Sequence, residues 1–146
     1  MPNLILTSDD FGLSKVFNQR MIEMLQAKYL SSISILVNHI TPYQHNQIVE
    51  IKKIYAQSDF SLGLHLETSG GDDNSNYQSQ WKKFEQLLES TPDYIDVHKG
   101  HFQNAAFDSI AAFCLQKEVP FRKYKETTLK VSSPENSLTA TFKSVS

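Results

Sequence analysis

Carboxylate and imidazole side chains lie within or directly after short apolar runs of this chain, where they could bind a metal ion. Asp9 and Asp10 follow one such run, His65 lies in a second, and His98 follows a third. Two histidines and one carboxylate are ordinary ligands for Zn²⁺ or another divalent ion. A site with three protein ligands keeps positions open for water and substrate, so the pattern indicates a catalytic metal site.

The two neighbouring aspartates are expected to have different roles. Adjacent residues in an extended chain point to opposite sides, so Asp9 and Asp10 would not readily bind one ion together. One carboxylate could hold the ion while the other takes a proton from water. Taken singly, these residues have simpler explanations, because turns often carry solvated aspartates and a lone histidine such as His65 is often structural. Their position at successive strand ends favours the metal site.

The elements that must position these residues alternate between strand and helix. The expected strands lie at 4–7, 34–37, 60–66, 94–97 and 119–121, with a helix predicted in each interval. The residues expected on the buried face of the first helix are Phe17, Met21, Met24 and Leu25. Such alternation implies parallel strands with right-handed crossovers. Ligands bind beyond the carboxyl ends of parallel strands, and the candidate residues would gather there.

The composition predicts one globular domain. The chain has 146 residues, 40% hydrophobic and 21% charged, which is enough to bury a single core. Its net charge is -2 and it has no basic stripe, so we expect no nucleic-acid partner. No secretion signal is evident, and no apolar run approaches the ~20 residues that span a bilayer. We expect a cytoplasmic protein without a membrane partner, whose single cysteine, Cys114, is a core residue.

Five segments match the motifs of a single family in the correct order. They are 7–14 with Asn18, 32–38, 62–66, 94–98 and 120–122. This series, which covers residues 4 to 124, resembles the YdjC/ChbG-type carbohydrate deacetylases. The resemblance implies an α/β fold, a partial or distorted (β/α) barrel with parallel strands like those of NodB and YdjC proteins.

The resemblance also implies a reaction. It assigns one divalent metal ion, magnesium or zinc, to Asp10, His65 and His98, and the general base to Asp9. The substrate would be an N-acetylated mono- or oligosaccharide, similar to chito-oligosaccharides, whose acetyl group is removed by amide hydrolysis. Metal polarisation of the carbonyl and of water, with Asp9 removing a proton, would form the tetrahedral oxyanion.

Three further residues have expected roles in that reaction. Arg122, at the family's Pro-x-Arg position, is expected to orient a carboxylate or contact substrate, and Lys99 is expected to bind substrate. The family's fourth-strand motif commonly has histidine where this chain has Tyr94 and Gly100. His101, one position displaced, is therefore the candidate proton donor to the leaving amine.

The family's members are considerably longer, and this chain is expected to be a version shortened at its C-terminus. Residues 1–124 would form the N-terminal part of the family fold, and 125–146 an extension or truncated remainder. A catalytically impaired remnant that still binds metal is therefore an alternative function. A homodimer would cover the strand edges that a partial barrel exposes.

Two other classes of protein share part of the pattern. A receiver-type signalling domain has paired acidic residues after its first strand. However, its third strand ends in a phosphoacceptor aspartate, whereas the third strand here carries His65 and ends near Glu67. An iron oxygenase that binds its metal through two histidines and one carboxylate is the other alternative, but such sites usually take a His-x-Asp/Glu triplet from one strand, which we do not expect here.

Overall fold

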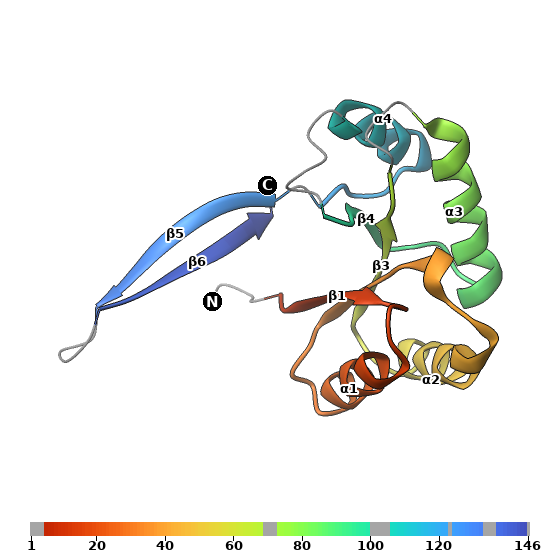
Figure 1. Ribbon diagram of the computed structural model, residues 1–146, viewed down its shortest axis with the longest axis horizontal. Helices are drawn as coiled ribbons and strands as arrows, with labels where there is room; N and C mark the ends of the chain where they lie inside the picture. The colour runs from red at the N-terminus through yellow and green to blue at the C-terminus, as the bar shows by residue number, and fades with distance from the viewer. Residues whose placement is uncertain (1–4, 69–72, 100–105, 123, 133–136, 146) are drawn as a thin grey trace.

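Four of the five expected strands form one parallel sheet. The computed structural model describes residues 5–68, 73–99, 106–122, 124–132 and 137–145. The strands are β1 (Thr7–Phe11), β2 (Ser32–Ile35), β3 (Ser61–Leu66) and β4 (Tyr94–Val97). Their order in the sheet is the order in the chain (Figure 1). This confirms the α/β fold with parallel strands that the alternating pattern predicted.

Helices connect these strands and bury one face of the sheet. They are α1 (Lys15–Gln26), α2 (His45–Tyr55), α3 (Asn74–Leu88) and α4 (Phe107–Lys117), with two short 3-10 helices, η1 (Val37–His39) and η2 (Pro42–Gln44). Sequential strand order with right-handed crossovers keeps the helices on a single face, as in a barrel. The core includes Ile22, Leu25, Ile33, Ile51, Leu64, Phe84, Ile95, Ile110 and Cys114.

The first helix buries only part of the face that hydrophobic periodicity predicted. Asn18 and Leu25 are buried, whereas Phe17 is 65% exposed and Met24 is 42% exposed, so the prediction was wrong for these two residues. The cause is the buried side chain of Asn18, which accepts a hydrogen bond from the Gly12 N–H. Neighbouring positions on a helix differ by about 100°, so turning Asn18 inward turns Phe17 outward.

The fifth expected strand is reduced to a single bridge. Phe121 pairs in parallel with Ile95. The Ile95 N–H donates to the Pro120 carbonyl at 2.9 Å, and the Arg122 N–H donates to the Ile95 carbonyl at 2.8 Å. Pro120 has no N–H to extend the ladder. This short pairing still brings Arg122 beside β4.

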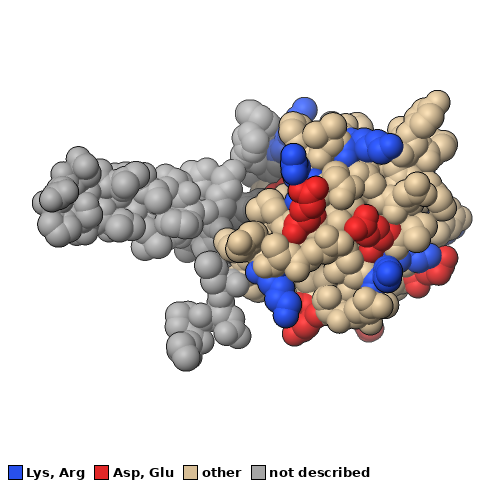
Figure 2. Space-filling view, turned by 90° about the horizontal axis from the view of Figure 1, so that it is seen from below, with Lys and Arg blue, Asp and Glu red and all other residues tan. Residues whose placement is uncertain are grey.

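The C-terminal residues form a separate antiparallel hairpin, β5 (Tyr124–Ser132) and β6 (Ser137–Val145). Figure 1 shows this hairpin projecting from the α/β unit. On the face of that unit seen in Figure 2, acidic and basic side chains are interspersed. Among the helices that can be described, none is both long and apolar enough to cross a membrane.

Candidate metal centre

Asp10 is held at the end of the first strand by a buried, hydrogen-bonded turn. Its backbone has a left-handed φ of 67°, and Gly12 has a φ of 122°, conformations that the surrounding structure must stabilise. The Gly12 N–H donates to Asn18 Oδ1 at 2.8 Å, and Gln44 Nε2 donates to the Gly12 carbonyl at 2.7 Å. Asn18 and Gln44 are both buried. These contacts hold the turn and therefore the direction of the Asp10 side chain.

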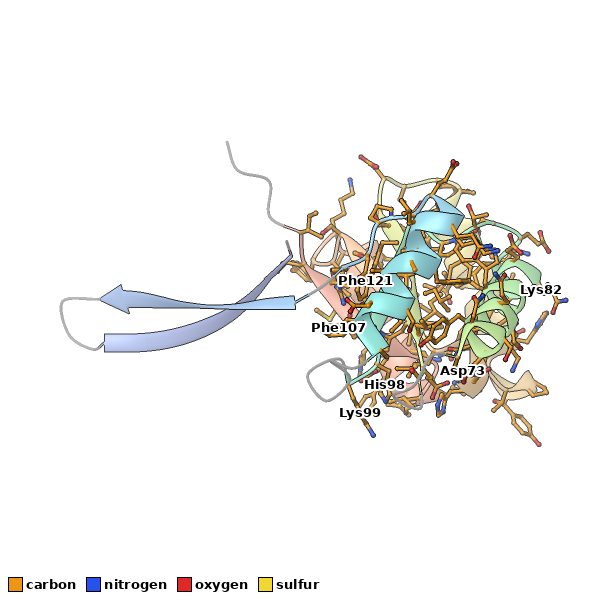
Figure 3. All side chains as sticks on the ribbon, turned by 90° about the horizontal axis from the view of Figure 1, so that it is seen from above. Asp73, Lys82, His98, Lys99, Phe107 and Phe121 are labelled. Atoms are coloured by element: carbon orange, nitrogen blue, oxygen red, sulfur yellow. The ribbon has the colours of Figure 1, made fainter. Side chains whose placement is uncertain are left out.

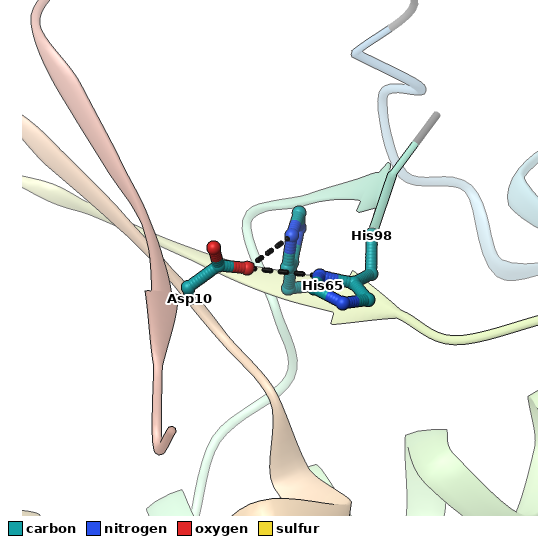
Figure 4. A group of neighbouring side chains, drawn as sticks. All are labelled: Asp10, His65 and His98. Carbon is teal, nitrogen blue, oxygen red and sulfur yellow. Dashed lines mark hydrogen bonds and ion pairs between the residues drawn. The ribbon is translucent and has the colours of Figure 1, made fainter. Parts of the chain in front are cut away.

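Three of the predicted site residues meet at this turn (Figure 4). Asp10 Oδ1 lies 3.0 Å from His65 Nε2 and 2.9 Å from His98 Nδ1. His65 belongs to β3 and is 3% exposed, and His98 directly follows β4. The two imidazole rings meet edge to face, with centroids 5.2 Å apart. Three successive parts of the chain thus contribute one side chain each.

The donor atoms of this cluster suit a divalent metal ion. One carboxylate oxygen and two imidazole nitrogens lie within 4.8 Å of one another, and such donors bind Zn²⁺ and related ions. The other ring nitrogen of His65, Nδ1, lies 2.8 Å from Asp96 Oδ1. A carboxylate in that position fixes the imidazole tautomer and leaves Nε2 free to act as a ligand atom. The residues therefore fit an ion held by Asp10, His65 and His98.

A second group of potential metal ligands overlaps the first. Asp9, His65 and Asp96 also have ligand atoms within 4.8 Å of one another. However, Arg122 Nη2 lies 2.5 Å from Asp9 Oδ1 and also pairs with Asp96. A guanidinium between the two carboxylates opposes a second cation at that position. The first group is therefore the better metal site, and Asp9 is anchored separately from it.

Burial and charge act in opposite directions on His65 and Asp96. Burial lowers the pKa of His65, but the hydrogen bond to Asp96 and the charges of three aspartates raise this pKa above its ordinary value. Burial raises the pKa of Asp96, but the hydrogen bond to His65 and the Arg122 charge hold this pKa below its ordinary value. In the metal-free protein these contacts favour an imidazolium paired with a carboxylate.

The other predicted residues differ in how closely they approach this cluster. Arg122 contacts Asp9 directly. Lys99 is exposed next to His98 and has a left-handed φ of 54° (Figure 3). His101, the candidate proton donor, lies outside the described residues.

A polar cluster beyond the end of β3 was not predicted. His39 Nε2 lies 2.8 Å from Glu67 Oε1, Asn38 Nδ2 donates to Glu67 Oε2 at 3.0 Å, and Lys83 Nζ donates to Asn38 Oδ1 at 3.1 Å. Burial raises the pKa of Glu67, but the hydrogen bonds to His39 and Asn38 bring it below its ordinary value. Glu67 has His-x-Glu spacing from His65, as in iron oxygenases, but its carboxylate binds these neighbours.

A groove lies at the opposite end of the strands. It has a volume of about 960 Å³ and is lined by the C-terminal part of α1, by α2 and by the residues that follow each helix. Those segments precede β2 and β3, whereas ligand sites of parallel sheets lie beyond the carboxyl ends of the strands. The chemistry therefore points to the Asp10 cluster rather than to this groove.

Comparison with known protein families identifies the family of this chain. The family model described as YdjC-like protein matches residues 3–79, more than half of the 146 residues. The chain belongs to the YdjC-like family. The match includes the Asp9-Asp10 turn and His65, whereas His98 and Arg122 lie beyond it. No curated protein matches this YdjC-like chain.

Solved structures share the fold at low sequence identity. A proposed cellobiose-phosphate cleavage protein from Enterococcus faecalis V583 is 16% identical, with a TM-score of 0.67, over 82% of this chain and 58% of that protein. A mutant of a CE4-family pseudoenzyme with restored enzymatic activity is 12% identical, with a TM-score of 0.56, over 82% of this chain and 43% of that one. The YdjC-like chain thus spans less than two thirds of the length of either protein.

The residue that sequence reasoning missed is the buried carboxylate behind the candidate metal centre. Asp96 is fully buried and lies opposite His65 in the register of β3 and β4. It also accepts a hydrogen bond from Ser34 Oγ. The available signal was an aspartate inside the apolar run 94–97, because a buried carboxylate requires partners.

Proposed function

We propose that this YdjC-like chain is a carbohydrate deacetylase domain that hydrolyses the acetamido group of N-acetylated mono- or oligosaccharides. The observation that carries the proposal is the separation of two adjacent aspartates. Asp10 faces His65 and His98, whereas Asp9 is paired with Arg122. One carboxylate can therefore hold a divalent ion while the other accepts a proton, and metal-assisted amide hydrolysis uses both functions.

Asp10, His65 and His98 are the proposed ligands of that ion. Zinc or magnesium bound there would polarise the acetyl carbonyl and lower the pKa of water. Asp96 orients His65 by accepting the hydrogen bond from its Nδ1. Because His65 is buried, its ring would keep this orientation while substrate enters and leaves.

Asp9 is the proposed general base. The Arg122 side chain, which is 11% exposed, anchors Asp9 at 2.5 Å and so holds its carboxylate in one direction. From that position Asp9 would take a proton from the water that attacks the carbonyl carbon, and His101 would protonate the leaving amine. Lys99, exposed next to His98, is proposed to contact the sugar.

Metal binding without turnover is the second candidate function. The chain corresponds to 58% of the Enterococcus protein and 43% of the CE4-family protein. In barrel enzymes, loops from several strand ends build the substrate site. The strands described here would supply only part of such a site, which is the observation that favours this candidate.

Acetate release from N-acetylated mono- and oligosaccharides tests the main proposal. Metal-supplemented wild-type protein is compared with Asp9→Asn and His65→Ala, and with His45→Ala as a control at an exposed histidine. The proposal predicts release by the wild type and the control, and a loss of at least about 100-fold in both site variants. No release by wild-type protein that binds one ion would favour the second candidate.

A further inference from the structure

The ring of Tyr94 lies across β3 in space that Gly63 leaves open. Gly63 is opposite Tyr94 in the register of β3 and β4, and a Cβ atom at Gly63 would lie 2.2 Å from Tyr94 Cζ. The Tyr94 hydroxyl lies 2.6 Å from Ser32 Oγ and donates to the Ile33 carbonyl at 3.1 Å. The side chain therefore starts from β4 and is tied to β2 at its far end. By strand alternation, it shares a face of the sheet with Asp96.

Arg122 is restrained by this ring and by its own backbone. Its guanidinium carbon lies 5.3 Å from the centroid of the Tyr94 ring, which is within cation–π range. The Arg122 N–H donates to the Ile95 carbonyl at 2.8 Å. The preceding residue, Phe121, packs edge to face against Phe107 of α4, with ring centroids 5.8 Å apart (Figure 3).

Open space lies beside Arg122. A groove of about 300 Å³ is lined by Arg122, Tyr94, Phe121 and Thr7 of β1, among others. Two carboxylate partners also hold Arg122, but without the aromatic ring its guanidinium would have an enlarged groove into which it could turn away from Asp9. The ring therefore limits the directions in which Arg122 can point.

We propose that Tyr94 is a positioning residue whose ring holds the guanidinium of Arg122 against Asp9. Its effect on turnover rests on the proposed deacetylase function, in which Asp9 is the general base, but the contact itself is measurable without turnover. The ring face restrains Arg122, whereas the hydroxyl only anchors the ring. Tyr94→Phe should therefore preserve the positioning, and Tyr94→Leu should remove it.

Nitrogen-15 NMR of arginine-labelled protein tests the contact directly. The chain has two arginines, Arg20 and Arg122, whose side chains are 73% and 11% exposed, so Arg20 is an internal control. We expect slow solvent exchange of the Arg122 Nε proton in the wild type and in Tyr94→Phe. In Tyr94→Leu, the exchange rate should approach that of Arg20. An unchanged Arg122 signal in folded Tyr94→Leu would overturn the proposal, and Tyr94→Met serves the same purpose if the leucine variant does not fold.

The kinetics of acetate release separate positioning from simple packing. Tyr94→Leu should lower kcat about tenfold with little change in KM, which is within the range of a lost cation–π contact. Tyr94→Phe should keep kcat within about twofold, although the loss of its hydrogen bonds lowers its melting temperature. When Tyr94→Leu is added to Arg122→Ala, the double variant should be less stable than Arg122→Ala alone but should have the same kcat.

Two results would contradict a role that acts through Arg122. One is a further fall in kcat when Tyr94→Leu is added to Arg122→Ala, and the other is a loss of activity in Tyr94→Phe. If wild-type protein releases no acetate, the deacetylase proposal fails, but the proposed contact between Tyr94 and Arg122 does not fail with it. The NMR comparison then still decides whether Tyr94 holds Arg122.

Discussion

The Nδ1 atom of His65 lies 2.8 Å from Asp96 Oδ1, and both side chains are buried. Asp96 also accepts hydrogen bonds from Ser34 and Arg122, so its carboxylate has a partner on each side. This arrangement directs the other nitrogen of His65 toward Asp10. Asp96 thus connects one proposed metal ligand to the arginine that anchors the proposed base.

Replacement of Asp96 by asparagine should weaken ion binding without removing any of the three proposed ligands. The amide keeps the size of the side chain but loses the charge that orients His65, and such losses typically cost about 10- to 100-fold in affinity. Isothermal titration with Zn²⁺ measures the change. Asp93→Asn is a matched control, because Asp93 precedes β4 and binds Leu62 and Tyr55 at the opposite end of that strand. Equal affinities in the two variants would exclude this role for Asp96.

Ion binding should strengthen as the pH rises. Burial lowers the pKa of His65, but Asp96 and the other nearby carboxylates raise it above its ordinary value. A protonated imidazole cannot bind a metal ion, so the ion must displace a proton. Affinity should therefore fall as the pH falls below this raised pKa, by up to about tenfold per pH unit for one proton. Titrations in buffers of different ionisation enthalpy would detect the released proton, and a constant affinity between about pH 5 and pH 8 would contradict the expectation.

Most of the sheet and the metal cluster could be predicted from local sequence. An apolar run marks or directly precedes each of the first four strands, although β1 (Thr7–Phe11) begins where its predicted run 4–7 ends, and parallel strands bring their carboxyl ends to one edge. That rule places the two aspartates, His65 and His98 at one edge, and the family resemblance selects Asp10 rather than Asp9 as the expected ligand. The fifth strand was harder to predict, because Pro120 allows only the bridge between Phe121 and Ile95.

Buried polar side chains account for what hydrophobic periodicity missed. Asn18 is fully buried, and its hydrogen bonds rather than apolar spacing decide which face of α1 points inward. Hydrogen bonds likewise allow the carboxylate of Asp96 to lie in a buried strand. Both depend on partners distant in the chain, Gln47 for Asn18 and Arg122 for Asp96, which a local pattern does not contain.

Replacement of Asn18 by alanine should destabilise the fold. The change removes the acceptor of the Gly12 N–H and the donor to Gln47 Oε1, and leaving buried groups unpaired costs about 1–3 kcal/mol. Urea denaturation measures the free energy of unfolding of each variant. Asn46→Ala, at an exposed position of α2, should change it by less than about 0.5 kcal/mol. Similar values for the two variants would show that the Asn18 contacts do not hold the turn.

Cys114 should react slowly with thiol reagents in the folded protein. It is 2% exposed, and burial raises the pKa of its thiol to about 12. The thiolate is the nucleophile, so at about pH 8 a far smaller fraction is reactive than for a free cysteine of pKa about 8.5. The rate of reaction with a chromogenic disulfide should rise strongly when urea unfolds the protein. Equal rates in the folded and unfolded states would contradict the burial of this residue.

The ion stoichiometry of the purified full chain tests whether Asp10, His65 and His98 hold one divalent ion. Isothermal titration with Zn²⁺ and Mg²⁺ would compare the wild type with His65→Ala, His98→Ala and the exposed control His45→Ala. We expect the wild type and the control to bind one ion per chain, and both site variants to lose at least about 100-fold in affinity for the ion. Undiminished binding by folded His65→Ala and His98→Ala, or no binding by the wild type, would contradict the account.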